Sequence, residues 1–336
     1  KMDVAGYNYG IKRYRHDLKK YPNRIILGSE TFCADAYKFI EMAKEEPRII
    51  GDFVWAGMDY LGEVGIGSWE YKEYAKRFDN GPGWVSAGSG RIVLTGIPLA
   101  ELTYTNVAFG LEKIGIGVVP VHYAHEAHSP SAWKMSNAIE SWSFEGCEGK
   151  KTSVEVYARA HHVSLYVNGE CVGTKNIKKD CKTNFHVAYH SGELKAVSYD
   201  ENNCKIAEKI LKTADAETRL TLAPEQEIVR EDDLVYIRMK YTDFEGEWKP
   251  MIRGSIRVTV EGGKILGIGS ACPYYERSYH GDTADTYYGE AMVIVKPDTA
   301  KELFVKAESP YGSAVAKVLV MKNKEATAYI EEVCHA

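Results

Sequence analysis

The chain has 336 residues and a mass of 37.6 kDa, which is more than one hydrophobic core usually serves, so two or three domains are expected. The formal net charge of -5 and the pI near 6.1 exclude nucleic acid as an expected partner, because phosphate binding needs clustered Lys and Arg. The mean hydropathy is -0.33 and no apolar run is long enough to cross a bilayer, so no membrane contact is expected.

The first third of the sequence alternates short apolar runs with amphipathic segments. In chain order the pattern predicts a strand end over residues 3–9, a helix over 12–20, a buried strand over 24–28, a helix over 34–44, a buried strand over 49–55 and a helix over 99–113. Such βα alternation predicts parallel strands and indicates the C-terminal portion of a (β/α)8 barrel. A whole barrel needs about 250 residues, so most of it is expected upstream of this segment.

Polar and aromatic residues follow each of these three strands. In barrel enzymes the active residues lie at the C-terminal ends of the strands, which here are Asn8-Tyr9, Ser29-Glu30 and Trp55. The sequence therefore points to these positions as the candidate site.

After residue 120 the sequence pattern changes to segments of alternating polar and apolar residues separated by turn signals, which is typical of β-sandwiches. Asn168-Gly169 is a strong hairpin signal. The predicted domains are residues 1–119 for the barrel portion, 120–222 for an immunoglobulin-like sandwich and 223–336 for a C-terminal sandwich. Strands are expected over residues 152–158, 163–169, 194–200, 234–243, 255–263, 291–296 and 314–321.

The cysteines are odd in number and scattered, and no two of them form a C-x-x-C pair. We therefore expect reduced thiols and a cytoplasmic rather than a secreted protein, and no signal-peptide pattern begins the chain. The seven are Cys33, Cys147, Cys171, Cys181, Cys204, Cys272 and Cys334. No cofactor is expected.

Three stretches carry a resemblance to a known family: DVAGYNYG at residue 3, YPNRIILGSET at residue 21 and GDFVWAGMDYLGE at residue 51. In this order they resemble the last three barrel strands of glycoside hydrolase family 2, the β-galactosidase type. VEVYARAHHVSLYVNGECVG resembles the module that follows the barrel in one bacterial subgroup, and residues 262–295 resemble that subgroup's final sandwich domain. The resemblance covers nearly the whole chain. It implies that a jelly-roll domain, an immunoglobulin-like domain and about five barrel strands precede it.

The resemblance also implies roles for four residues. Retaining glycosidases use two carboxylates, one as nucleophile and one as acid/base. Glu30 in GSET matches the family nucleophile, and Tyr9 matches the Tyr that donates a hydrogen bond to it. Trp55 matches the Trp that floors the sugar subsite, and Asn8 is a weaker candidate for sugar contacts. The acid/base Glu lies in an Asn-Glu pair in the family, and no Asn-Glu pair occurs here.

Each of these residues also has a purely structural interpretation. Without the resemblance, Glu30 would be a surface or helix-start carboxylate, Trp55 a core residue and Tyr9 an ordinary strand aromatic. A metal site is not expected at the histidine cluster, whose flanking Pro120 and Pro130 favour a surface loop, nor at the turn residues in HGDTADT. The histidines are His122, His125 and His128, and the turn residues are Asp282 and Asp285.

The expected substrate is a carbohydrate, most simply a β-galactoside. Family β-glucuronidases carry an Asn-x-Lys motif that the matching residues 84–96 lack, and Arg91 there more simply flanks a strand. The alternative is a non-catalytic subunit or a carbohydrate-binding or scaffold fragment of a split or cleaved family 2 enzyme. The N-terminal remainder of the enzyme is the expected partner, a homo-oligomer is possible, and the chain by itself is expected to be inactive.

Overall fold

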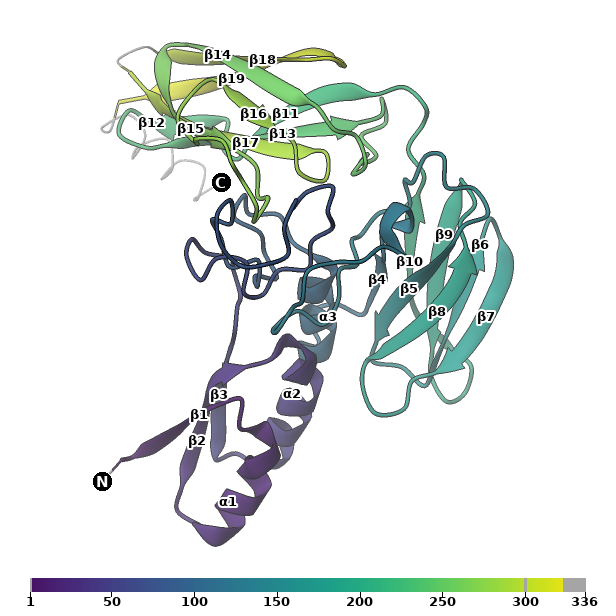
Figure 1. The fold of residues 1–336 in the computed structure, drawn as a ribbon. Coiled ribbons are helices and arrows are strands. Elements are labelled where there is room, and N and C mark those ends of the chain that lie inside the picture. Colours follow the sequence, from purple (N-terminus) through teal and green to yellow (C-terminus); the bar gives the residue numbers. More distant parts are fainter. Residues whose placement is uncertain (1, 299–300, 323–336) are drawn as a thin grey trace, which may run out of the picture. The chain divides into compact units, whose positions relative to one another are not determined.

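The computed structural model describes residues 2–298 and 301–322, so Cys334 lies outside the described part. The fold is mostly β-sheet with few helices, as the predicted sandwich portions require (Figure 1). Contacts divide the chain into two units. One runs to Thr213 and includes Pro273–Tyr275, and the other holds the remaining residues from Ala214 onward. The division into three domains stays a prediction.

A three-stranded parallel sheet opens the first unit, which confirms the predicted βα alternation. Its strands are β1 (Val4–Asn8), β2 (Ile25–Thr31) and β3 (Ile49–Val54), in the order β1-β2-β3. The helices between them are α1 (Tyr14–Lys20) and α2 (Ala36–Glu45), each preceded by a 3-10 turn, Ile11–Arg13 and Cys33–Asp35. Figure 1 shows both helices on the same face of the sheet.

The two faces of this sheet differ in their exposure. On the helix side, Ile26 and Ile49 pack with Tyr14 and Leu18 of α1 and with Phe39 and Met42 of α2. Successive strand residues point to opposite faces, so the neighbours of these core residues point away from the helices. On β3 the side chains of Ile50 and Phe53 remain 57% and 64% exposed. The register with β2 shifts at Ile50, so alternation does not place Ile50 and Phe53 on one face. Asp52 lies near Tyr14 of α1, so its neighbour Phe53 points away from the helices and presents an apolar side chain to solvent.

The helix predicted over residues 99–113 is shorter than expected. It forms α3 (Ala100–Phe109) and ends where Gly110 adopts a left-handed φ of 79°, a common way to terminate a helix. The residues that follow form β4 (Ile114–Val118), which pairs antiparallel with β5 (Lys151–Ala158). Residues 110–113 of the predicted helix are therefore not helical, because the glycine ends the helix before them.

The first all-β portion contains two sheets, β4-β5-β8 and β10-β9-β6-β7. Asn168 and Gly169 form the β6–β7 hairpin turn, both with positive φ, which confirms that prediction. Buried side chains such as Val154, Phe185 and Leu165 come from both sheets. The strands are β5 (Lys151–Ala158), β6 (His162–Val167), β7 (Glu170–Asn176), β8 (Lys182–Ala188), β9 (Glu193–Tyr199) and β10 (Lys205–Lys212).

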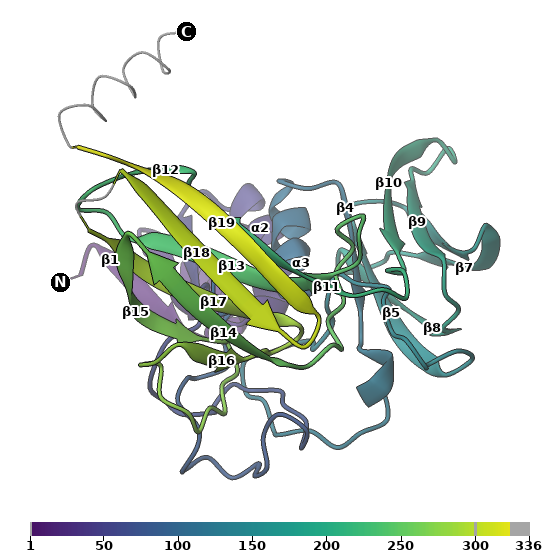
Figure 2. The same ribbon diagram turned by 90° about the horizontal axis from the view of Figure 1, so that it is seen from above.

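The second unit is a sandwich of a four-stranded sheet, β11-β13-β17-β15, and a five-stranded sheet, β12-β19-β18-β14-β16. Figure 2 shows the two layers, and residues such as Ile237 and Val305 join them in one core. The strands are β11 (Arg219–Pro224), β12 (Ile228–Arg230), β13 (Val235–Thr242), β14 (Ser255–Glu261), β15 (Gly263–Gly269), β16 (Thr283–Asp285), β17 (Glu290–Pro297), β18 (Glu302–Ser309) and β19 (Gly312–Met321).

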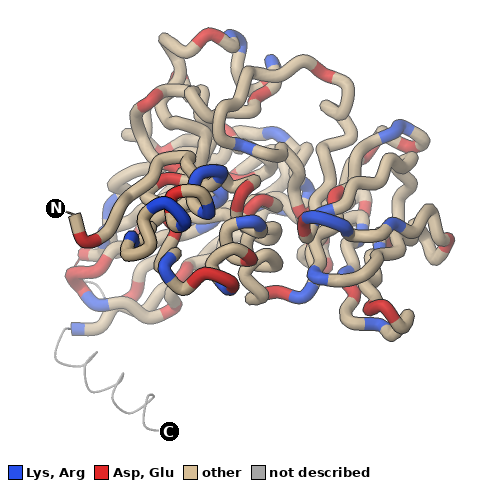
Figure 3. The backbone as a smooth tube through the Cα atoms, turned by 90° about the horizontal axis from the view of Figure 1, so that it is seen from below, with Lys and Arg blue, Asp and Glu red and all other residues tan. Residues whose placement is uncertain are grey.

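Acidic and basic residues are interspersed along the backbone, as Figure 3 shows. Within the described ranges no helix has both the length and the apolar character needed to cross a membrane. His122, His125 and His128 are all exposed and lie on or just after the 3-10 turn Val121–Tyr123.

Candidate active site

The four predicted site residues meet at one edge of the parallel sheet, where its three strands end. Asn8 is the register partner of Glu30, and the Tyr9 backbone N–H donates to the Glu30 carbonyl at 2.6 Å. On the other side of β2, the Trp55 backbone N–H donates to the Thr31 carbonyl at 2.9 Å. Backbone hydrogen bonds thus hold the ends of β1 and β3 directly against the end of β2.

An irregularity in β2 changes how Glu30 is presented. Tyr7 pairs with Gly28, but the next residue, Asn8, pairs with Glu30, so Ser29 is an extra residue on β2. The pairing of β2 with β3 also has a register shift, which lies between Gly28 and Thr31 of β2. Bulges of this kind re-aim side chains and are common beside active sites. The half-buried side chain of Glu30 lies within this bulged stretch.

Tyr9 follows β1 in a backbone conformation that side chains other than Gly rarely adopt, with φ at 53°. Its ring lies 4.4 Å, centroid to centroid, from that of Phe32. Burial raises the pKa of Tyr9, and hydrogen bonding with Glu30 and the charges of Glu30 and Glu63 raise it further, whereas a hydrogen bond from Trp133 opposes them. The raised pKa keeps Tyr9 a neutral phenol, whose hydroxyl proton is available to donate.

Asn8 and Trp55 have separate partners. The Ser29 hydroxyl donates to the Asn8 side-chain oxygen at 2.8 Å, which ties the ends of β1 and β2 together a second time. The Trp55 indole N–H donates to the Tyr60 hydroxyl at 3.1 Å, and Tyr60 in turn donates to the Glu63 carboxylate. The peptide bond between Trp55 and Ala56 is cis. The indole is thus held in place by the loop that follows β3.

Two other polar residues of this loop serve the fold. Asp59 is 6% exposed and accepts the Ser89 backbone N–H at 3.1 Å. Arg91 is equally buried and donates to the Thr105 hydroxyl of α3. Both side chains hold the long loop against its surroundings.

Asp52 of β3 is a titratable group on the helix side of the sheet. Its Oδ1 accepts the Thr31 hydroxyl at 2.6 Å, while its buried Oδ2 has no hydrogen-bond partner. Burial raises the pKa of Asp52 to about 6, although the Thr31 hydrogen bond and the Arg91 charge lower it. The ionised form is therefore disfavoured in the folded chain.

This raised pKa predicts a pH dependence of stability. The folded chain holds the Asp52 proton up to about pH 6, whereas an unfolded Asp releases it near pH 4. The free energy of unfolding therefore falls as pH rises from about 4 to 6 and then stays lower. Asp52→Asn should remove this loss. Its free energy of unfolding at pH 7 should exceed that of the wild type by about 2 kcal/mol, after allowance for partial exposure. Urea unfolding of both proteins at pH 4.5 and pH 7 measures this difference. If the free energy of unfolding changed equally between the two pH values in the wild type and in Asp52→Asn, the prediction would be contradicted.

A separate cavity of about 670 Å³ lies between the loop after β3 and strands β5 and β8. Its lining includes Trp69, Tyr71, His125, His128, Asn137 and Glu155, and none of the four predicted site residues. His128 stacks on Trp69 with ring centroids 4.2 Å apart. In the described ranges no three His, Cys, Asp or Glu side chains are grouped so as to bind a metal ion.

Two contacts of the site were not predicted from the sequence. Tyr60 fixes Trp55, and Trp133 donates its indole N–H to the Tyr9 hydroxyl at 2.6 Å. Tyr60 lies only five positions after Trp55 within GDFVWAGMDYLGE, so its proximity was a usable signal. Trp133 is 124 positions from Tyr9, in a stretch without periodicity, and no sequence signal joined the two.

Comparisons with known proteins agree with the all-β portions. Residues 220–315 match the model for glycoside hydrolase family 2 C-terminal domain 5, and residues 149–207 match a domain of unknown function, DUF4982. A curated relative, the β-galactosidase BoGH2A of Bacteroides ovatus, is 24% identical over 266 residues, which are 77% of this chain and 27% of that protein.

Two solved structures of glycosyl hydrolase family 2 members from Bacteroides cellulosilyticus are also similar. The first superimposes on 95% of this chain with a TM-score of 0.85 and 27% sequence identity. The second superimposes on 94% of this chain with a TM-score of 0.79 and 26% sequence identity. The chain spans 42% and 40% of those two chains. This chain is thus a relative of the glycoside hydrolase family 2 enzymes and corresponds to a C-terminal part of them.

Proposed function

We propose that the chain supplies the nucleophile side of a retaining β-glycosidase, with Glu30 as the nucleophile and β-galactosides as the first substrate class. The observation that carries the proposal is the position of Glu30. It lies on the bulged end of the middle parallel strand, beside Tyr9 and one strand away from Trp55. The relationship to family 2 enzymes, one of them named a β-galactosidase, supports the substrate class.

The proposed reaction has two displacements. The Glu30 carboxylate attacks the anomeric carbon, the glycosidic C–O bond breaks, and a second carboxylic acid protonates the leaving oxygen. Water activated by that same second group then attacks the glycosyl-enzyme and releases Glu30. The second carboxylate must lie roughly 5–5.5 Å from Glu30, and we assign it to the N-terminal remainder of the enzyme.

The neighbours of Glu30 fit supporting roles. The neutral Tyr9 hydroxyl, whose pKa is raised by burial and by Glu30, donates to the carboxylate and stabilises its ionised form before attack. Trp55, fixed by Tyr60, offers an aromatic surface for a sugar ring. Asn8, at the exposed end of β1, is the candidate for a contact to a sugar hydroxyl.

The three-stranded sheet is proposed to be the end of a (β/α)8 barrel within residues 1–119, followed by the two sandwiches over 120–222 and 223–336. Two features support it. In the described chain β1 and β3 are the edge strands of their sheet, and Phe53 exposes a large apolar side chain on the face away from the helices. A closed barrel would pair these edges and bury this face. We propose a cytoplasmic enzyme in which the N-terminal remainder provides the other strands.

The test compares the 336-residue chain with the assembled enzyme, by which we mean this chain together with the N-terminal remainder, in one polypeptide or two. We expect no hydrolysis of 4-nitrophenyl β-galactoside by the chain alone and hydrolysis by the assembled enzyme. Proton NMR should show the β-anomer as the first product. An α-anomer formed first would exclude the retaining mechanism, and comparable activity of the chain alone would exclude the divided site.

A further inference from the structure

The Tyr9 hydroxyl has a second partner from a distant part of the sequence. The Trp133 indole N–H donates to it at 2.6 Å. Trp133 belongs to the irregular segment between the 3-10 turn Val121–Tyr123 and β5, outside the elements that carry Asn8, Glu30 and Trp55. This segment therefore reaches back to the strand ends of the parallel sheet.

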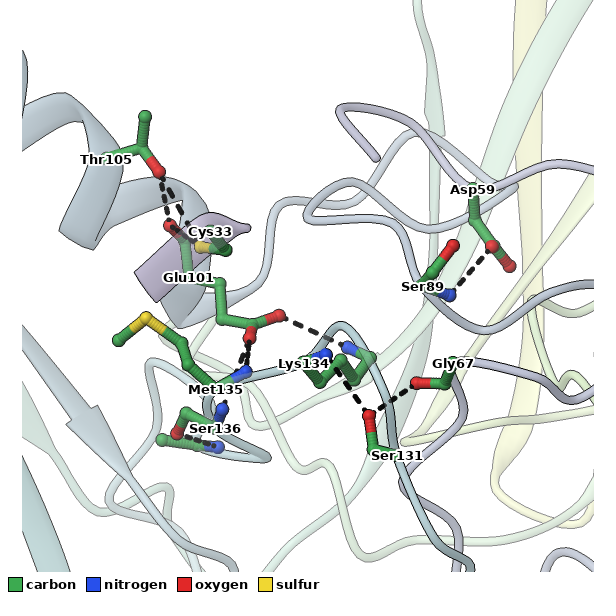
Figure 4. A network of polar contacts seen from close by, with 11 residues as sticks. Cys33, Asp59, Gly67, Ser89, Glu101, Thr105, Ser131, Lys134, Met135 and Ser136 are labelled. Carbon is green, nitrogen blue, oxygen red and sulfur yellow. Dashed lines mark hydrogen bonds and ion pairs between the residues drawn. The ribbon is translucent and has the colours of Figure 1, made fainter. Parts of the chain in front are cut away.

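The segment around Trp133 is anchored on both sides. On its C-terminal side, Oε1 of Glu101, a residue of α3 that is 1% exposed, accepts the backbone N–H of Met135 at 2.6 Å and that of Ser136 at 3.2 Å. The other carboxylate oxygen of Glu101 lies 3.5 Å from Nζ of Lys134. Figure 4 shows Glu101 reaching from the helix to all three residues.

On the N-terminal side the anchor is Ser131. Its hydroxyl donates to the Gly67 carbonyl at 2.8 Å and accepts the Lys134 backbone N–H at 3.1 Å (Figure 4). Trp133 thus lies between two fixed points that are only five residues apart in sequence. Such anchoring fixes the indole before a substrate binds, so that little ordering remains to be done in the reaction.

The partner of this indole is unusual within the molecule. Three other tryptophans donate their indole N–H to backbone carbonyls: Trp84 to Asp79 at 3.1 Å, Trp142 to His190 at 2.9 Å and Trp248 to Tyr288 at 3.0 Å. Trp55 and Trp133 instead donate to tyrosine hydroxyls, those of Tyr60 and Tyr9, at the ends of the parallel strands. A purely structural indole needs only a carbonyl.

A tyrosine hydroxyl has one proton to donate and two lone pairs that accept. When Trp133 occupies a lone pair of Tyr9, the rotation of the hydroxyl is restricted and its proton is directed to the remaining acceptor, Glu30. We propose that Trp133 is a positioning residue of this site, which acts on Glu30 through Tyr9. This inference rests on the function proposed above for Glu30.

The first test uses the 336-residue chain and needs no activity. The titration of Tyr9 is followed by NMR of ring-labelled tyrosine, assigned with Tyr9→Phe. Because donation from Trp133 lowers the pKa of Tyr9, Trp133→Phe should raise the titration midpoint of Tyr9. Trp248→Phe removes an indole hydrogen bond in the other unit and is the matched control, with no expected change in Tyr9. An unchanged Tyr9 midpoint in Trp133→Phe would overturn the proposal.

A reciprocal measurement covers the case in which Trp133→Phe does not fold. In Tyr9→Phe, the indole N–H resonance of Trp133 should move upfield while those of Trp142 and Trp248 stay in place. An unmoved Trp133 resonance would equally overturn the proposal.

The second test uses the assembled enzyme and the rate at which a 2-deoxy-2-fluoro β-galactoside labels Glu30. Trp133→Phe and Tyr9→Phe should each slow labelling by about tenfold, and the double variant should be no slower than Tyr9→Phe alone. If the double variant were slowed by the product of the two single-variant factors, Trp133 would act independently of Tyr9. That result alone would overturn the inference. If wild-type Glu30 is not labelled at all, the proposed function fails first and the inference fails with it.

Discussion

Replacing Glu30 with Gln in the assembled enzyme is expected to reduce kcat by about 10⁴-fold or more while leaving the fold intact. The amide has nearly the same shape as the carboxylate and keeps an oxygen toward Tyr9, but it cannot form the glycosyl-enzyme. Circular dichroism and thermal unfolding should match the wild type, because Glu30 is only half-buried at a strand end. Steady-state assays with an aryl β-galactoside measure the loss.

Glu63 provides the sharpest comparison for this variant. It is the other carboxylate whose charge acts on Tyr9, and it accepts the Tyr60 hydroxyl rather than projecting from a strand end. Glu63→Gln should lower kcat by about tenfold or less, since only the support of Trp55 is weakened. Mass spectrometry after trapping with a 2-deoxy-2-fluoro β-galactoside should locate the label on Glu30. A label on Glu63 or Asp59 would refute the assignment.

The second large effect is expected at Glu101, whose buried carboxylate accepts two backbone N–H groups and lies near the Lys134 ammonium. Glu101→Ala leaves both N–H groups and a nearly buried ammonium without their acceptor, which should cost about 3 kcal/mol of unfolding free energy. For a unit of this size that corresponds to a melting temperature lower by about 6–12 °C. Differential scanning calorimetry of the 336-residue chain measures it, with the transition of the other unit unchanged.

Two further variants separate the causes. Glu101→Gln keeps an oxygen for the backbone N–H groups of Met135 and Ser136 but loses the charge facing Lys134, so its destabilisation should be smaller. Glu208→Ala breaks a solvent-exposed pair with Lys205, whose charged atoms are 2.7 Å apart, and should change the melting temperature little. If Glu101→Ala melts like Glu208→Ala, the buried network does not stabilise the segment around Trp133.

The sequence by itself determined the local elements and the candidate residues of this protein. Apolar runs before Gly28 and Trp55, and the amphipathic stretches between them, were enough to predict parallel strands with intervening helices. Asn168-Gly169 likewise fixed a hairpin, because these two residues adopt positive φ with little strain. In each case the signal lies within a few neighbouring residues, where propensity and periodicity act directly.

Only the tertiary structure decided which residues support the site. The bulge at Ser29 follows from pairing with both neighbouring strands, and the link from Trp133 to Tyr9 joins residues 124 positions apart. The segment that carries Trp133 is anchored by Glu101, whose carboxylate is buried although charged residues on helices usually face solvent. Periodicity records which face of an element is apolar, but it carries no information on which distant side chain completes a hydrogen bond. That information arises only when the chain is packed.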